Sequence, residues 1–375
     1  MRAQRPFLLH FVGPAAVLLG FVAFTLLGHG APVPDPKPVT VGFVYVGAKN
    51  DFGYNQAHAV AAAALNKLKG VRCVEKENQA EDDGAKEVMQ AMIAKDKVKV
   101  IFATSYGYLR PQVDDVARKH PDIRFLHPSG PWPQGQFPDN VITFIGFADE
   151  ARYLSGVVAG SMTKSNKLGF VAAKPIPFIR REINAFCLGA RSVNPKAEVI
   201  VLFTGNWSDE LQEANAVKRL IDRGADVVTC LVDSPKLIVE TAERRGVMSC
   251  GYHVNQQSLA PKGYLTGAEW NWDKLYVEWV QQVQKGEKLS TGRMGGLKAG
   301  FVRMSPYGPA VTEHARKAAD AAQAKLLDGS LVIFKGPLKD NTGKEVIDAG
   351  IKLDLNDTKL QSMDYLVEGV VDGAR

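Results

Sequence analysis

The stretch VTVGFVYVGAKNDFGYNQAHAVAAAALNKLKG, residues 39–70, decides the fold class. Its first part, VTVGFVYVG (39–47), is a short apolar run rich in β-branched and aromatic residues, which indicates a buried strand. Its second part, YNQAHAVAAAALNKLKG (54–70), has helical periodicity and ends at Gly70, a common helix stop. A buried strand followed directly by a helix begins a βαβ unit, so this stretch predicts a parallel sheet.

The alternation of strand and helix continues along the chain and is then repeated. The first set extends to residue 147, a helical pattern follows over 148–164, and a second set spans 167–254. We therefore predict an α/β fold with two doubly wound, Rossmann-like lobes joined by crossovers. The expected boundaries are residues 39–150 with about 254–290 for lobe 1, and residues 151–253 with about 291–375 for lobe 2.

Length and composition agree with a two-domain globular protein. The chain has 375 residues, of which 46% are hydrophobic and 23% are charged. These values exclude disordered, collagen-like and disulfide-scaffold classes. The net charge is +6, but Arg2 and Arg5 contribute two of these charges, and most other basic residues are interspersed with acidic ones. We therefore expect no nucleic-acid partner.

The N-terminus has the features of an export signal. A short basic start is followed by the apolar run LLHFVGPAAVLLGFVAFTLLG (8–28) and a small-residue exit. We predict a signal peptide over 1–30, a Pro-rich linker over 31–38 and a periplasmic location. An uncleaved membrane anchor is the alternative, because the apolar run is long enough to span a bilayer. A lipid anchor is not expected, since no cysteine follows the run.

The four cysteines are spaced too far apart to indicate a zinc site. Cys230 and Cys250 each end an apolar run, so a disulfide between them is possible in an oxidising compartment. Buried free thiols are the commoner outcome. The other two cysteines are Cys73 and Cys187.

Aromatic and polar residues gather where the predicted strands end. Because ligands of open α/β sheets bind outside the carboxyl ends of the strands, these residues predict a binding cleft between two lobes. Aromatic faces beside amides and carboxylates suit a flat heterocycle or a sugar. The candidate ligand-binding residues are Asp51, Phe52, Tyr54, Asn55, Ser105, Tyr106, Trp207, Asp233, His253, Asn271 and Trp272.

Motifs for catalysis are missing. The chain has no G-x-S-x-G, no GxxxxGK[ST] and no HExxH, and GAKNDFG (47–53) lacks the glycine spacing of a dinucleotide-binding turn. We therefore expect a binding protein rather than an enzyme, with no cofactor and no catalytic or metal site.

Several motifs resemble the basic membrane protein (BMP) family of ABC-transporter substrate-binding proteins. They include VGFVYVGAKNDFGYNQAH, IFATSYGYLRP, FTGNWSDE, CLVDSP and GYHVN, and the resemblance runs from about residue 38 to FKGPLKDNTGKEV near the C-terminus. It implies a type I periplasmic-binding-protein fold, a purine base or nucleoside as ligand, and a membrane permease as partner. We expect a monomer.

The resemblance also implies which residues hold the ligand. The base would lie between Phe52 or Tyr54 and Trp207, while Asn55, Ser105, Tyr106, Asp233 and Asn271 would face base edges or ribose hydroxyls. Closure of the lobes around the ligand would be the binding mechanism.

The sequence departs from the family at two places. Many relatives have Trp-Thr-Tyr-Gln-His where this chain has residues 54–58, and an aspartate where it has His253. Imidazole cannot replace a carboxylate that accepts two ribose hydroxyls without loss, so this departure favours a base over a full nucleoside as the ligand. The alternatives are a protein of the same fold that binds a sugar or another small polar solute, a ligand-sensing module, and a secreted nucleoside-processing enzyme.

Overall fold

The computed structural model describes residues 35–130, 132–133 and 135–373. The predicted signal peptide and most of the predicted linker lie outside these residues. Within the described part of the chain, no helix combines the length and the apolar character needed to cross a bilayer.

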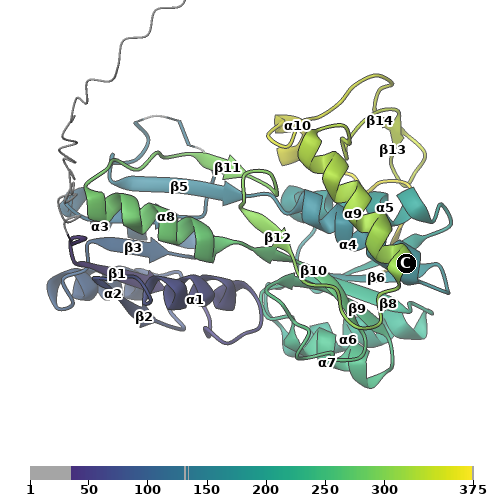
Figure 1. Ribbon diagram of the computed structural model, residues 1–375, viewed down its shortest axis with the longest axis horizontal. Helices are drawn as coiled ribbons and strands as arrows, with labels where there is room; N and C mark the ends of the chain where they lie inside the picture. Colours follow the sequence, from purple (N-terminus) through teal and green to yellow (C-terminus); the bar gives the residue numbers. More distant parts are fainter. Residues whose placement is uncertain (1–34, 131, 134, 374–375) are drawn as a thin grey trace, which may run out of the picture. The chain divides into compact units, whose positions relative to one another are not determined.

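The first sheet has six parallel strands in the order β11-β5-β4-β3-β1-β2 (Figure 1). Its strands are β1 (Val39–Val44), β2 (Val71–Lys76), β3 (Val100–Ala103), β4 (Arg124–His127), β5 (Val141–Gly146) and β11 (Arg293–Gly295). The accompanying helices are α1 (Tyr54–Leu65), α2 (Asp83–Ala94), η1 (Tyr106–Leu109), α3 (Gln112–Lys119) and α8 (Trp272–Lys285).

The second sheet has the order β12-β10-β9-β8-β6-β7-β15, and only β12 runs antiparallel to its neighbour among the described strands of this sheet. Its strands are β6 (Lys167–Ala172), β7 (Glu198–Phe203), β8 (Val227–Leu231), β9 (Met248–His253), β10 (Tyr264–Trp270), β12 (Val302–Met304) and β15 (Val370–Asp372). The remaining elements are α4 (Asp149–Met162), α5 (Pro177–Val193), α6 (Glu210–Asp222), α7 (Lys236–Arg244), α9 (Glu313–Asp328), β13 (Leu338–Lys339), β14 (Glu345–Ile347) and α10 (Thr358–Gln361).

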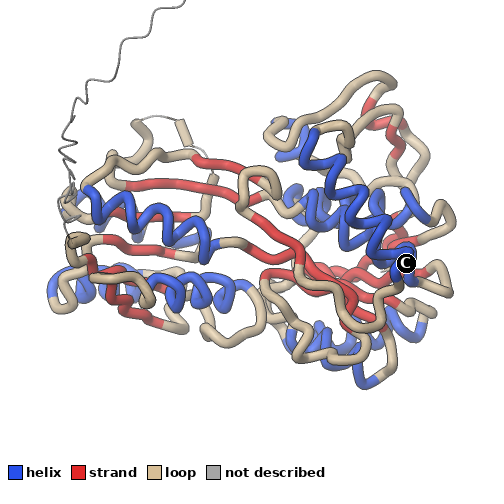
Figure 2. Tube along the Cα trace, in the orientation of Figure 1, coloured by secondary structure: helices blue, strands red, loops and turns tan. Residues whose placement is uncertain are grey.

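Both sheets are covered by helices on two faces, as the predicted doubly wound fold requires. In the first sheet, Phe43 and Phe102 pack against Tyr276 of α8, with ring centroids 4.0 Å apart for Phe102 and Tyr276. The opposite face carries α2 and α3, which bury residues such as Met89 and Val113. In the second sheet, α6 and α7 lie on one side, and α4 and α5 on the other (Figure 2). The predicted fold class is confirmed.

The chain passes between the two sheets three times. It crosses from β5 to α4, from β10 to α8, and from β11 to β12. Sheet membership differs from the expected lobe boundaries at two strands near these crossovers. Residues 264–270 extend the second sheet beside β9, and residues 293–295 add to the first sheet beside β5. Sequence periodicity indicates a strand, but it carries no information about which neighbouring sheet has an edge free to pair.

All four cysteines are free thiols, so the possible Cys230–Cys250 disulfide is not formed. The two residues end up on the neighbouring strands β8 and β9. Burial raises the pKa of each thiol to about 12, which keeps these thiols protonated and unreactive.

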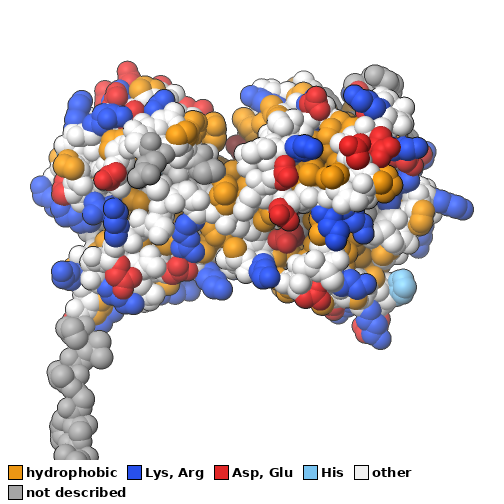
Figure 3. Space-filling model, turned by 90° about the horizontal axis from the view of Figure 1, so that it is seen from above, with side chains coloured by type: hydrophobic (Ala, Val, Ile, Leu, Met, Phe, Trp, Pro, Cys, Tyr) orange, Lys and Arg blue, Asp and Glu red, His pale blue; other side chains and the backbone are white. Residues whose placement is uncertain are grey.

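Charged side chains are mixed on the surface. On the face shown in Figure 3, Lys and Arg side chains alternate with Asp and Glu side chains rather than forming one basic area.

Candidate functional site

The loop before α1 is fixed by the carboxylate of Asp51. Its Oδ1 atom accepts hydrogen bonds from the backbone N–H groups of Gly53 (2.8 Å) and Gln56 (3.0 Å). Its Oδ2 atom accepts from the backbone N–H (3.0 Å) and the side-chain Nδ2 (2.9 Å) of Asn55. These bonds hold Phe52 in the left-handed region, at φ 55°, which is unfavourable for a non-glycine residue. The conformation of the loop is therefore set by hydrogen bonds within the chain.

This loop reaches across to elements of the second sheet. The Tyr54 backbone N–H donates to the carbonyl of Asp233 (2.9 Å), and Gln256 Nε2 donates to the carbonyl of Phe52 (2.7 Å). The carboxyl ends of strands from both sheets therefore meet here, at the place where the sequence predicted a cleft.

Five aromatic rings cluster beside this contact. The ring of Tyr54 packs edge-on against His58 and His253, with centroid distances of 4.9 and 5.8 Å. Trp272 stacks on Trp270 at 5.0 Å and lies parallel to His58 at 5.9 Å. The cluster combines residues from α1, α8, β9 and β10, so flat ring faces are concentrated where the two sheets meet.

His253 is held neutral in one tautomer. The indole N–H of Trp270 can only donate, so His253 Nδ1 accepts this bond (2.9 Å) and Nε2–H donates to the carbonyl of Val232 (3.1 Å). Burial and the charge of Arg152 lower the pKa of His253 well below its ordinary value. Both ring nitrogens are thus occupied within the protein.

Other polar groups at the site have no partner. Among the described residues, the buried atoms His58 Nε2 and Trp272 Nε1 have no hydrogen-bond partner. Burial lowers the pKa of His58 to about 3, so this ring is neutral. Buried polar atoms are rarely left unpaired in folded proteins, so these two atoms are candidate hydrogen-bond partners for a bound molecule.

The carboxyl group of Asp233 is also unpaired among the described residues. Its pKa is raised to about 8, first by burial and then by the negative charges of Asp51, Glu213 and Glu81. A carboxyl group with such a pKa can donate as well as accept a hydrogen bond near neutral pH.

Comparison with known proteins identifies the chain. The family model described as "ABC transporter substrate-binding protein PnrA-like", named Bmp, matches residues 38–349. The chain belongs to the Bmp family. A purine-binding protein of Brucella abortus is 35% identical to this Bmp-family chain, over 95% of this chain and 99% of the relative. A Haloferax volcanii relative named as an ABC transporter glucose-binding protein is 29% identical, over 91% of this chain and 82% of the relative.

Solved structures give the same fold for this Bmp-family protein. A solute-binding protein of an ABC transporter system from Conexibacter woesei superposes with a TM-score of 0.66 at 22% identity, covering 78% of this chain and 97% of that one. The predicted family and the predicted type I periplasmic-binding-protein fold are both confirmed.

Seven predicted site residues of this Bmp-family protein lie in or beside the contact region. Four of them come from the loop before α1 and the first turn of that helix, and three lie at or just after the carboxyl ends of β8, β9 and β10. They are Asp51, Phe52, Tyr54, Asn55, Asp233, His253 and Trp272.

The other predicted residues have different surroundings. Ser105 donates its hydroxyl proton to the carboxylate of Glu81, and Tyr106 on η1 is 65% exposed. Trp207 contributes its backbone carbonyl to the N–H of Asp233 (2.7 Å). The Nζ atom of Lys174 lies over the ring of Trp207, 5.9 Å from the ring centroid.

The side chain of Asn271 forms hydrogen bonds at the crossover from β10 to α8. Its Nδ2 donates to the carbonyl of Gly300 (3.0 Å), and its Oδ1 accepts from Arg303 (2.8 Å). In this structure, both ends of its amide hold the β10–α8 connection.

Sequence reasoning missed four residues that build this region: Gly53, His58, Glu81 and Gln256. Three of them lie outside the strand ends that we inspected, in helix α1, before α2 and after β9. The only signal for His58 was a polar residue within the alanine-rich apolar face of α1, which is more often a sign of a satisfied core residue.

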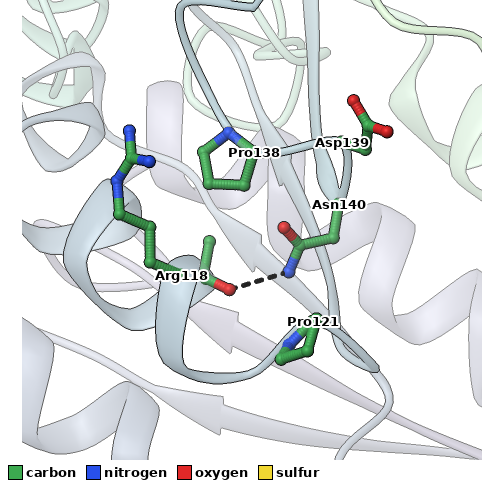
Figure 4. Close-up of a pocket in the computed structure, with 6 residues that line it drawn as sticks. Arg118, Pro121, Pro138, Asp139 and Asn140 are labelled. Atoms are coloured by element: carbon green, nitrogen blue, oxygen red, sulfur yellow. Dashed lines mark hydrogen bonds between the residues drawn. The ribbon is translucent and has the colours of Figure 1, made fainter.

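A separate pocket of about 460 Å³ lies near the amino ends of β4 and β5, and its lining includes Arg118, Pro138 and Asp139. Asn140 in this pocket donates to the carbonyls of Ala117 (3.1 Å) and two other residues, as Figure 4 shows for one of these bonds. The amide therefore closes the α3–β4 connection. Ligands of this fold bind at the opposite ends of the strands.

No group of three or more His, Cys, Asp or Glu side chains suited to a metal ion occurs in the described part of the chain.

Proposed function

We propose that this ABC transporter substrate-binding protein binds a purine base or nucleoside where the carboxyl ends of its two sheets meet. The observation that carries the proposal is the aromatic cluster around Tyr54, which lies beside an unpaired carboxyl group and two unpaired ring N–H or N atoms. The purine-binding Brucella relative supports the same ligand class, because it aligns over nearly all of both chains.

The ligand would be bound both by aromatic stacking on its ring faces and by hydrogen bonds to its edges. Each base–aromatic stack contributes ~1–3 kcal/mol, with little dependence on which base is bound. A buried donor or acceptor left unmatched costs ~1–3 kcal/mol, so Asp233, His58 and Trp272 would set specificity. We infer that Phe52 or Tyr54 and Trp207 supply the ring faces, and that the ligand induces the two lobes to close.

The protein would act outside the cytoplasm. We infer export to the periplasm by residues 1–30, delivery of ligand to a membrane permease, and no catalytic step. The relatives with an assigned role in transport are substrate-binding proteins, which supports the last inference.

A sugar is the second candidate ligand. The Haloferax relative named for glucose supports it, and stacked indole rings such as Trp270 and Trp272 also suit the apolar face of a sugar ring.

Mass spectrometry of the small molecule released from denatured purified protein tests the proposal. It is paired with thermal unfolding in the presence of adenine, hypoxanthine, their nucleosides, glucose and a pentose. We expect a purine to be released, and at about 100 times its dissociation constant to stabilise the protein by ~2.7 kcal/mol. Stabilisation by glucose or the pentose, with none by any purine, would contradict the proposal.

Trp207→Ala tests one ring face. It should weaken purine binding by about 5- to 150-fold, because one stacking interaction of ~1–3 kcal/mol is lost. Leu327→Ala removes an exposed apolar side chain of α9 and should leave the affinity unchanged. If the two variants bind purine with equal affinity, Trp207 does not contact the ligand.

A further inference from the structure

A short set of contacts joins the loop before α1 to the loop before α7. We call residues 51–54 together with 233–236 the latch. The backbone of Tyr54 donates to the carbonyl of Asp233 (2.9 Å), and Lys236 Nζ lies 5.7 Å from the ring centroid of Phe52. The bond from Gln256 to the Phe52 carbonyl (2.7 Å) reinforces these contacts. The latch connects elements of the first sheet to elements of the second.

The latch leaves no room for a side chain at residue 53. A Cβ atom on Gly53 would overlap the carbonyl oxygen of Asp233 and would lie 2.6 Å from Cδ of Pro235. Glycine is therefore needed here because the two loops approach too closely for any side chain to fit between them.

Closing the latch brings carboxyl groups together. Asp51 and Glu81 belong to the first-sheet side, and Asp233 and Glu213 belong to the second-sheet side. The negative charges of the other three carboxylates all raise the pKa of Asp233. The hydroxyl of Tyr54 donates to the carbonyl of Thr104. Burial and then the negative charge of Asp233 raise the pKa of Tyr54, so this hydroxyl is neutral.

The cationic groups of the region do not neutralise this cluster. Among the described residues, neither Lys236 nor Lys174 forms an ion pair with Asp233. Lys236 lies over Phe52 and 4.0 Å from Glu240, and Lys174 lies over Trp207. His253 is neutral, as shown above.

We propose that the latch is proton-dependent: it is made when the Asp233 carboxyl is protonated and is released when that carboxyl ionises. This inference rests on the proposed function, in which two lobes close around a ligand. Because the latch joins the two lobes, its proton dependence makes both closure and ligand retention depend on pH.

The direction of the pH effect follows from the two environments of Asp233. In the closed latch its pKa is about 8, compared with an ordinary value of 3.8. When the loops separate, the carboxyl regains water and leaves Asp51 and Glu81, so its pKa falls toward the ordinary value. Closing therefore takes up a proton. The closing equilibrium is most favourable below pH ~4 and falls by up to about tenfold per pH unit until pH ~8.

Small-angle scattering of the ligand-free full chain at pH 6 and pH 9 tests the proposal with the wild type and Asp233→Asn. The Asn variant keeps the latch hydrogen bond, because that bond uses the backbone carbonyl. We expect the wild type to be more open at pH 9, and the Asn variant to have the same radius of gyration at both pH values. Asp222→Asn, an equal charge change on exposed α6, should behave like the wild type. A wild type that does not open, or an Asn variant that opens equally, overturns the proposal.

Gly53→Ala tests the steric requirement. It should be open at both pH values while keeping the wild-type far-ultraviolet circular dichroism. Gly84→Ala, at an exposed helical position that meets only the end of the Asp82 side chain, should behave like the wild type. A compact Gly53→Ala variant at pH 6 would overturn the latch.

Adenine affinity is measured on the same samples. It should fall between pH 6 and pH 8 by about 10- to 100-fold in the wild type and by much less in Asp233→Asn. If adenine, hypoxanthine and their nucleosides all fail to bind at either pH, the purine proposal fails, whereas the ligand-free scattering still decides the latch.

Discussion

At the scale of single residues, the most demanding interaction is the fully buried ion pair beneath His253. Arg152 Nε donates to Glu182 (2.9 Å), its Nη atoms donate to Thr229 Oγ1 (3.1 Å) and to the carbonyl of Cys230 (2.6 Å), and both charged side chains are at most 1% exposed. The guanidinium lies 3.8 Å from the ring centroid of Tyr252, the neighbour of His253. The pair therefore supports the backbone that carries His253.

Removing one partner of this pair should be costly. Arg152→Met leaves Glu182 buried without its counter-charge, so we expect a loss of ~3–5 kcal/mol in the free energy of unfolding, measured by guanidinium denaturation. Arg245→Met, which breaks the exposed pair with Asp222, should cost at most ~1 kcal/mol. The double variant Arg152→Met/Glu182→Leu should be more stable than Arg152→Met alone. Equal losses in the Arg152 and Arg245 variants would contradict this account.

Residue types predicted where these side chains lie better than they predicted what each side chain does. The sequence placed Asp51, Asn55 and His253 at the strand ends, and all three lie there. Their polar atoms, however, are used by the loop, by α1 or by Trp270. The sequence could not distinguish these uses, because capping and ligand binding select the same short polar residues.

At the scale of elements, long periodic segments were predictable and short strands were not. The predicted helical pattern over 148–164 forms α4 (Asp149–Met162) in the structure, because the pattern extends over several turns. The strands β11 and β15 have only three residues each and carry no usable period. They form because the edges of β5 and β7 offer unpaired backbone groups.

Helices α4 and α5 approach each other through three glycines. A Cβ atom on Gly156 would overlap the carbonyl of Phe186, and one on Gly189 would overlap the carbonyl of Tyr153. Gly160 meets the backbone of Ala190 in the same way. Since all three obstacles are backbone atoms, no side-chain rotation can make room.

Gly189→Ala should therefore force the two helices apart. We expect a loss of ~1–3 kcal/mol in the free energy of unfolding, measured by chemical denaturation, although alanine favours helix more than glycine does. Gly84→Ala, at an exposed position of α2 where a Cβ meets only the end of the Asp82 side chain, should be close to neutral. A Gly189 variant as stable as the Gly84 variant would show that the close packing contributes nothing.

At the scale of the whole molecule, the sequence predicted two lobes but not how their edges join. The repeated pattern predicted the two sheets, and the carboxyl ends of strands from both sheets do meet, at the contact between the loops before α1 and α7. The contacts that join them depend on Gly53, Gln256 and a backbone carbonyl, none of which has a chemical signature in the sequence.

The C-terminal segment is the other part whose place was not predictable. It runs from the end of α9 through the β13–β14 hairpin and α10 to β15, which adds an edge strand to the second sheet. Its residues Phe334, Leu353 and Leu360 pack with Ala185 of α5. Fully buried Asn184 joins the two, because its Oδ1 accepts from the N–H of Val367 (2.9 Å) and its Nδ2 donates to the carbonyl of Tyr365 (3.0 Å).

Asn184→Ala should release this segment without unfolding the first sheet. The substitution leaves a buried N–H and a buried carbonyl unpaired, at a cost of ~1–3 kcal/mol. Hydrogen exchange followed by mass spectrometry should accelerate over residues 363–372 by about 5- to 150-fold, while β1 and β3 keep their wild-type protection. Asn356→Ala, at an exposed position of the same segment, should change neither region. Equal acceleration in β1 would instead mean that the segment and both sheets unfold as one cooperative unit, and unchanged exchange over 363–372 would mean that Asn184 does not hold the segment in place.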